Sequence, residues 1–266
     1  MQKFLIRSTL ITALMLLIWI GLNQILNGSI WNGMTISKSA LTVEYCEFND
    51  SSKFFHQSMN TYSNLVYFFL GILICQIAWG DYKNRSFQNR LANFPLLSAL
   101  MGFCFIYLSF GSAFFHASLT YAGQRVDMNG TYSVTLTLVS IGLYQVLHKI
   151  NFSEQAKKIW IGTMVIIILC FYQIHLLISS SILVAALIFL MLILMGINYL
   201  QFPKKRYLFL GILSLVLIIV AIKIRTMDIQ KINCDPYSLY QGHSVWHLLA
   251  GLSSFCNYAF FRFLKV

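Results

Sequence analysis

The chain consists of long apolar runs separated by short polar segments. We count eight runs, each close to the ~20 residues that a helix needs to cross the hydrocarbon core of a bilayer. Strict alternation of apolar and polar positions, which marks a membrane β-barrel, does not occur, so the pattern predicts helices. We therefore expect an all-α polytopic membrane protein with eight spans. They cover residues about 4–26, 60–79, 92–115, 126–148, 158–178, 180–200, 205–223 and 241–263.

The composition supports membrane helices and argues against a nucleic-acid partner. Hydrophobic residues make up 58% of the 266 residues and charged residues only 10%, which is typical of a polytopic membrane protein. The net charge of +11 comes from basic residues that stand in short groups between the apolar runs, where they act as topology signals. We therefore expect the bilayer as a partner and no nucleic acid, while the sequence leaves the oligomeric state open.

The distribution of basic residues predicts the orientation of the chain. With eight spans, thirteen of the nineteen lysines and arginines lie on one side of the membrane, together with both termini. Because cytoplasmic loops are enriched in basic residues, both termini are expected in the cytoplasm. The first run follows Lys3 and Arg7 as in a signal peptide, but no small-x-small cleavage site follows it. We therefore expect a retained helix.

Polar chemistry is concentrated in two stretches of this apolar chain. GSAFFHASLTYAGQRVD carries Ser112 and His116, which share a helix face, and ends at Asp127. GHSVWHLLAG carries His243 and His247, which are also four residues apart. The predicted topology brings both stretches to the non-cytoplasmic face of the membrane. Residues far apart in the sequence are thus expected at the same depth, as one site requires.

Three imidazoles with a nearby carboxylate are typical of a catalytic zinc site. Such a site has three protein ligands, a fourth position for water and a base for that water. Ionisable groups inside a membrane usually mark a functional site because burying them is unfavourable. A bis-histidine heme is the rival interpretation, but His243 and His247 lie on one helix and cannot bind both faces of one iron. We therefore expect His116, His243 and His247 to bind zinc.

Asp127 and Ser112 are the expected catalytic groups beside the metal. Asp127 is placed to accept the proton of the water, and Ser112 to donate a hydrogen bond to the developing oxyanion. Each residue has an alternative role. Asp127 could accept a hydrogen bond from a ligand imidazole and so orient it. Ser112 could bond to a helix carbonyl, as serines in membrane helices commonly do.

The segment EYCEFND, which precedes the second run, gathers side-chain oxygens on the same face. Glu44, Glu47, Asn49 and Asp50 are oxygen ligands of the kind that calcium requires. The alternative is a solvated acidic loop, because the spacing is not that of an EF-hand.

The six cysteines fall into two groups. Four lie within apolar runs and are expected to serve as packing residues. Cys46 and Cys234 lie in predicted non-cytoplasmic loops, where an oxidising compartment would allow a disulfide. Two free thiols or metal ligation are the alternatives at this point.

Three motifs together carry a resemblance to a known family. GSxxFHxxLxYxxQxxD, HxxWH, and ExCExN followed by NTxSN resemble the alkaline ceramidases, whose membrane hydrolase superfamily includes the adiponectin-type receptors. The ending CDPYSLYQGHSVWHLLAG is similar to the bacterial ceramidase-domain branch. The resemblance implies a ceramidase-like seven-helix membrane domain over residues 44–266. Residues 1–43 then form an extra N-terminal transmembrane helix and loop.

The resemblance also implies an activity and a set of roles. It implies zinc on His116, His243 and His247, with Ser112 supporting the oxyanion and Asp127 activating water. A disulfide between Cys46 and Cys234 is implied as well. So is a calcium site, with ligands from Glu44, the Tyr45 backbone carbonyl, Glu47 and Asn49; a further calcium-binding glutamate of the family falls on Gln57.

The function expected from these observations is a zinc-dependent intramembrane amidase. Its substrate would be ceramide or a related membrane lipid, cleaved at the N-acyl amide to a sphingoid base and a fatty acid. Two alternatives share the metal core: a non-catalytic lipid receptor or scaffold, and an ester-cleaving lipid hydrolase. The expected location is a bacterial inner membrane, with the site toward the non-cytoplasmic face. The sequence does not indicate the acyl-chain preference or the pathway.

Overall fold

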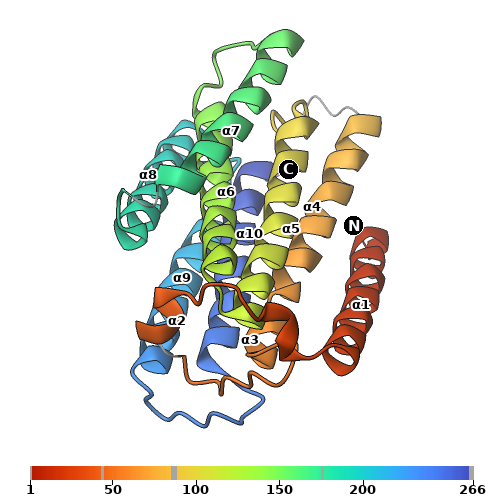
Figure 1. Cartoon of the computed structure of the whole chain (residues 1–266). Helices are drawn as coiled ribbons and strands as arrows, with labels where there is room; N and C mark the ends of the chain where they lie inside the picture. Colours follow the sequence, from red (N-terminus) through yellow and green to blue (C-terminus); the bar gives the residue numbers. More distant parts are fainter. Residues whose placement is uncertain (1, 43–44, 85–88, 175–176, 264–266) are drawn as a thin grey trace.

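The computed structural model describes every residue except 1, 43–44, 85–88, 175–176 and 264–266. The described part is all-helical, as predicted, with isolated bridges as its only β-type pairing (Figure 1). Its eight long helices are α1 (Gln2–Ile25), α4 (Leu65–Lys83), α5 (Pro95–Ser118), α6 (Tyr121–Val146), α7 (Glu154–Ile174), α8 (Ser180–Gln201), α9 (Leu208–Ile229) and α10 (Gly242–Arg262). Three short helices, η1 (Gly28–Trp31), α2 (Lys38–Thr42) and α3 (Ser58–Ser63), precede α4.

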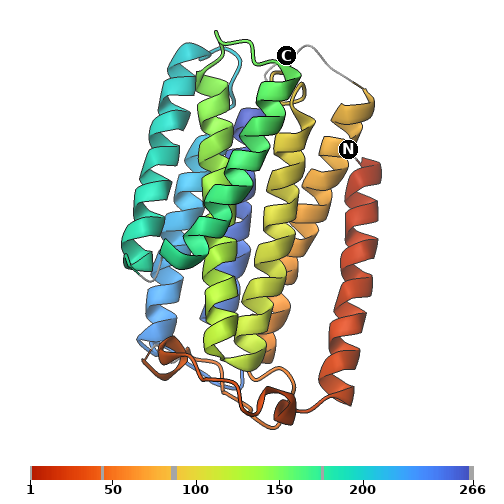
Figure 2. The ribbon, with the colours of Figure 1, turned by 45° about the horizontal axis from the view of Figure 1, so that its top comes forward.

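The long helices run side by side as one bundle, and α1 begins at the end where α10 finishes (Figure 2). Helix α5 packs against both α4 and α6, and α10 packs against α9, α6 and α4. Helix α1 lies at the edge of the bundle against α4. The buried core lies among α4, α5, α6 and α10, so the two polar stretches identified in the sequence belong to its central helices.

Within the described residues, six helical segments are long and apolar enough to cross a membrane, and the protein is therefore an integral membrane protein. They are α1, the combined α3 and α4, α5, α7, most of α8, and α9. Outward-facing leucines and isoleucines along α1, α7, α8 and α9 suit contact with lipid. Helices α6 and α10 have the length but a more polar composition. The division into seven core spans and one extra span stays a prediction.

The turn between α5 and α6 places the first polar stretch. Leu119 adopts the left-handed conformation (φ 52°) that ends α5, and Thr120 caps α6 by accepting a hydrogen bond from the Gly123 amide at 3.1 Å. A Cβ at Gly123 would lie 2.8 Å from the Phe115 Cα, so glycine allows the two backbones to approach closely. Helix α6 begins at Tyr121, earlier than predicted, which leaves Asp127 inside the helix.

Candidate metal centre

Three histidine side chains converge in the core near one end of the bundle. His116 lies near the end of α5, and His243 and His247 lie in the first turns of α10. Their ligand atoms all lie within 4.8 Å of one another, and the Nε2 atoms of His116 and His243 are 3.1 Å apart. Two nitrogens bound to one tetrahedral zinc at its usual bond length would be about 3.3 Å apart. The spacing therefore fits a single metal ion.

A hydrogen-bond chain fixes the ring of His116. Its Nδ1 lies 2.7 Å from the Oε1 of Gln57, and the Gln57 amide nitrogen donates to Asn49 Oδ1 at 2.6 Å. Because the amide nitrogen is engaged elsewhere, Oε1 faces the ring and accepts the proton of Nδ1. This tautomer leaves the Nε2 lone pair free to bind a metal. Gln57 thus acts as the orienting partner of the ligand.

His247 is held in the same way by a serine. Its Nδ1 lies 2.7 Å from Ser63 Oγ, and the Ser63 hydroxyl donates its proton to the Asn60 carbonyl at 2.9 Å. The Ser63 oxygen must then accept the Nδ1 proton of His247. The Nε2 lone pair of His247 is therefore also free for a metal, and α3 supplies the group that orients it.

His243 is positioned through its backbone. Its amide donates to Asp228 Oδ1 at 3.2 Å, and the Cys46 amide donates to Asp228 Oδ2 at the same distance. A carboxylate is favourable at this place because the amides at a helix N-terminus carry partial positive charge. The His243 Nδ1 is buried and has no hydrogen-bond partner among the described residues. The His243 nitrogen that meets the other rings is Nε2, 3.1 Å from the Nε2 of His116, and this convergence of ring nitrogens fits a bound cation.

Ser112 and Asp127 lie beside the histidines. Ser112 is 2% exposed, one turn before His116 on α5, and its hydroxyl bonds to the Asp127 side chain. The Asp127 carboxylate acts electrostatically on Tyr45 and Tyr67. The ring centroids of these tyrosines lie 3.8 Å from that of His243 and 6.0 Å from that of His247, respectively. Asp127 is not part of the histidine cluster, and its role beside that cluster stays a prediction.

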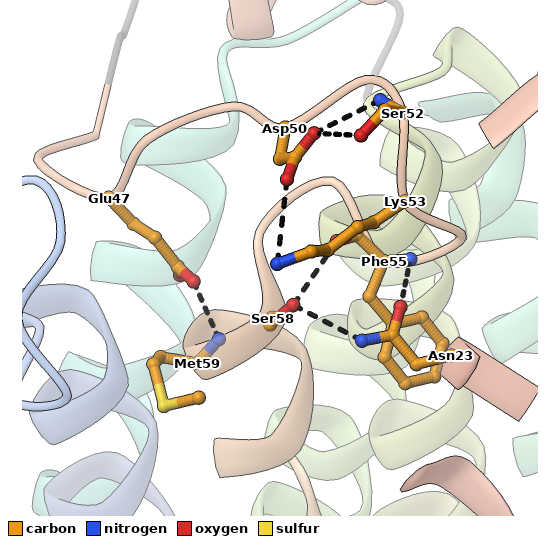
Figure 3. A network of polar contacts seen from close by, with 8 residues as sticks. All are labelled: Asn23, Glu47, Asp50, Ser52, Lys53, Phe55, Ser58 and Met59. Carbon is orange, nitrogen blue, oxygen red and sulfur yellow. Dashed lines mark hydrogen bonds and ion pairs between the residues drawn. The ribbon is translucent and has the colours of Figure 1, made fainter. Parts of the chain in front are cut away.

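The oxygens of the expected calcium loop are engaged in hydrogen bonds. Glu47 accepts from the Met59 and Asn60 amides at 2.6 and 2.8 Å and thereby caps α3 (Figure 3 shows the bond to Met59). Burial raises the pKa of its carboxyl to about 7. Asn49 receives the Gln57 amide, and Glu44 lies outside the described residues. The histidines form the single candidate metal cluster within the described part, and calcium binding stays a prediction.

The loops around the site are linked by a disulfide between Cys46 and Cys234. Next to it, the Phe48 amide donates to the Pro236 carbonyl at 3.0 Å. The disulfide joins the loop that carries Glu47 to the loop that leads into α10. Both loops lie at the histidine end of the bundle (Figure 1).

Helix α1 is attached to this loop region by one asparagine. Asn23 accepts from the Phe55 amide at 2.8 Å, and its amide group lies 3.5 Å from Ser58 Oγ (Figure 3). On the same side, Trp19 is buried and its ring contacts Phe55 edge-on. Helix α1 therefore supports the segment that leads to α3.

Sequence reasoning missed Gln57, Ser63, Asp228 and Arg225 as parts of the site. The motif NTxSN contained Ser63, but nothing in its spacing indicated a bond to a histidine 184 positions away. Arg225 was counted only as a loop charge, because the seventh span was expected to end at residue 223. Helix α9 continues to Ile229, and the Arg225 charge acts on all three histidines and on Asp127.

Comparison with known proteins agrees with the geometry. The family model described as Ceramidase matches residues 37–266, which is most of the chain and includes every residue of the histidine centre. No curated protein matches the chain. The family match supports a hydrolase that acts on amide bonds, in a membrane and on a lipid substrate. Because this match spans the whole helical core, the chain belongs to the ceramidase family.

Proposed function

We propose that this protein is a zinc-dependent intramembrane amidase. It hydrolyses the N-acyl amide of ceramide or a related lipid to a sphingoid base and a fatty acid. Membership of the ceramidase family supports the reaction class. The observation that carries the metal assignment is the meeting of three histidine nitrogens, two of them with the opposite ring nitrogen bonded to Gln57 or Ser63.

His116, His243 and His247 would hold the metal. Zinc bound by three neutral nitrogens lowers the pKa of a bound water to about 7 and polarises a carbonyl oxygen. Asp127 accepts the proton of the attacking water and returns it to the leaving amine. Once Asp127 carries the water proton, it no longer needs the Ser112 hydroxyl as a donor, and Ser112 then donates its single proton to the oxyanion that develops on the substrate carbonyl.

An apolar cavity supports a lipid substrate. It has a volume of about 100 Å³ and lies between α6, α8, α9 and α10. Tyr67, which contacts His247, lines it together with Trp246, Leu192 and Leu215. This volume holds part of an acyl chain, and the outward faces of α8 and α9 are apolar enough to border the bilayer. A lipid tail can therefore approach from the membrane.

The loop charges support an inner-membrane location with both termini in the cytoplasm. In that orientation the histidine centre and the disulfide lie on the opposite, oxidising side. Residues 44–266 act as the seven-helix catalytic domain, and residues 1–43 as an added helix. Calcium on the loop around Glu47 and Asn49 would strengthen α3 and its contact to His247.

The test is product analysis with the purified full chain in lipid nanodiscs. Elemental analysis should find about one zinc per chain, and mass spectrometry should detect release of fatty acid and sphingoid base from a ceramide panel. Ester analogues of the same chain length serve as the comparison. Cleavage of esters alone would identify an ester hydrolase. Ceramide binding without turnover in the zinc-loaded protein would identify a receptor and reject the amidase.

A further inference from the structure

A second cavity, with a polar lining, lies at the end of the bundle opposite the histidines. It has a volume of about 390 Å³ and is bordered by the loops that follow α4, α6 and α8. The cavity is lined by Arg90, Lys157, Lys205 and Arg206, together with His148, and none of its described lining residues is an aspartate or glutamate. The cavity, which is open to the outside, therefore concentrates positive charge on its lining. Its location is the side that the charge distribution of the loops assigns to the cytoplasm.

The arginines of this cavity are held by neutral oxygens. Arg90 donates to four carbonyls near the end of α6, at 2.6 to 3.1 Å. Arg206 is 3% exposed and bonds through Nε to Asn198 and through Nη1 to the Phe261 carbonyl, both at 2.8 Å. Burial lowers its pKa to about 10, so it remains charged at pH 7. Its charge has no carboxylate partner among the described residues.

Two other basic residues show what is missing at Arg206. Arg262, at the same end, forms a salt bridge with Asp81, and Lys157 pairs with Glu154 at 2.8 Å. Lys205 is exposed beside Arg206 and forms no ion pair within the described chain. A buried charge without a counterion is unfavourable. The cavity therefore contains uncompensated positive charge that an anion would neutralise.

An apolar groove adjoins this cavity on the outside of the bundle. It has a volume of about 520 Å³ and lies between α6 and α7, and Phe152 lines both spaces. The groove is bordered by Leu143 and Val139 on α6 and by Ala156 and Ile167 on α7. Helix α7 rises about 16 Å from Ala156 to Ile167. This is about half of the ~30 Å hydrocarbon core, the depth of one leaflet.

We propose that the cavity binds the phosphate of an anionic phospholipid, with one acyl chain in the groove between α6 and α7. Lys205 and Arg206 supply the charge, and Phe152 marks the change from head group to chain. A free phosphate would use the same cations but would leave the groove without a role. The apolar groove beside the basic cavity therefore favours a lipid of the basic leaflet. This site is separate from the histidine centre and is independent of hydrolysis.

Native mass spectrometry of the full chain tests the proposal, with phosphatidylglycerol compared against phosphatidylcholine. The wild type should bind phosphatidylglycerol more tightly, and Lys205→Glu should weaken that binding by roughly tenfold. Lys204→Glu is the matched control, because this neighbour does not line the cavity. Equal binding of both lipids, or equal loss in the two variants, would overturn the site.

A second variant separates a lipid from a soluble phosphate. Ala156→Trp fills the groove but leaves the basic cavity intact. It should therefore weaken the binding of phosphatidylglycerol without changing the thermal stabilisation by glycerol phosphate. Thermal unfolding with glycerol phosphate alone provides the comparison. Full stabilisation by glycerol phosphate together with unchanged lipid binding in Ala156→Trp would show a soluble ligand and reject the lipid. Both readouts use binding and are unaffected by the fate of the amidase proposal.

Discussion

The two ends of the bundle both bury polar side chains, but they bury different chemistry. At one end, neutral imidazoles from α5 and α10 point their nitrogens at a common position and are oriented by Gln57 and Ser63. At the other end, arginines such as Arg90 and Arg206 donate to helix carbonyls and line a basic cavity. Lone pairs that converge favour a cation, and guanidinium groups without carboxylates favour an anion. The arrangement of donors and acceptors, rather than polarity alone, therefore decides which kind of ion a buried polar cluster suits.

The largest expected effect on the histidine end comes from removing a ligand. His116→Ala should lose the zinc and all hydrolysis, because two nitrogens cannot hold the ion in a catalytic geometry. Elemental analysis and the ceramide assay measure both. His148→Ala removes a histidine at the opposite end and should keep the metal. Retention of full zinc in His116→Ala would contradict the site.

The next effect separates the metal from its base. Asp127→Asn should keep the zinc but lower turnover by roughly 10²- to 10⁴-fold, the range that general acid–base catalysis contributes. The amide preserves the size of the side chain and can still bond to Ser112. Normal turnover in this variant would reject Asp127 as the base, whereas loss of zinc would make it a structural support of the ligands.

A smaller effect is expected at the group that orients His116. Gln57→Leu should weaken zinc affinity by roughly 10- to 100-fold, because removal of an orienting partner leaves the ring free to turn. Gln57→Glu keeps an acceptor for the Nδ1 proton and should restore most of the affinity. Chelator competition measures both variants. Equal affinity in Gln57→Leu and the wild type would show that packing alone orients the ring.

The disulfide should affect stability more than metal binding. Cys46→Ser is expected to lower the free energy of unfolding by about 2–4 kcal/mol, since the bond closes a long loop, and to reduce zinc affinity only slightly. Cys170→Ser, at an exposed free thiol, is the control. Thermal unfolding with and without a reductant provides the measurement. An unchanged midpoint in Cys46→Ser would argue against a stabilising bond.

The smallest effect on the metal should come from the opposite end. Asp81→Asn removes the negative charge that neutralises Arg262 in a buried ion pair. This should lower the free energy of unfolding by about 3–5 kcal/mol. Zinc content of the folded fraction should not change, because the pair lies at the other end of the bundle. Loss of zinc in folded Asp81→Asn protein would show that the two ends are coupled.

Periodicity and length were enough to predict the long helices, but their ends were wrong where polar residues lie within helices. The fourth span was expected to begin near residue 126 and the seventh to end near residue 223. Helix α6 begins earlier, at Tyr121, and α9 continues past Arg225 to Ile229. A hydropathy pattern stops at a charge, whereas a folded helix continues when another part of the chain contacts that charge. Such contacts leave no local signal.

The sequence by itself determined the helical class, the membrane environment and the candidate ligands. Apolar runs of this length must satisfy their own backbone hydrogen bonds, and an i, i+4 pair must share a helix face. Only the tertiary structure decided how the ligands are held. The orienting bonds come from Gln57, Ser63 and Asp228, which lie in other segments. They reach the histidines because α3 packs against α5 and α10, and α9 packs against α10. A single hydrogen bond between distant segments produces no periodicity or fixed spacing in the sequence, so only the folded structure shows it.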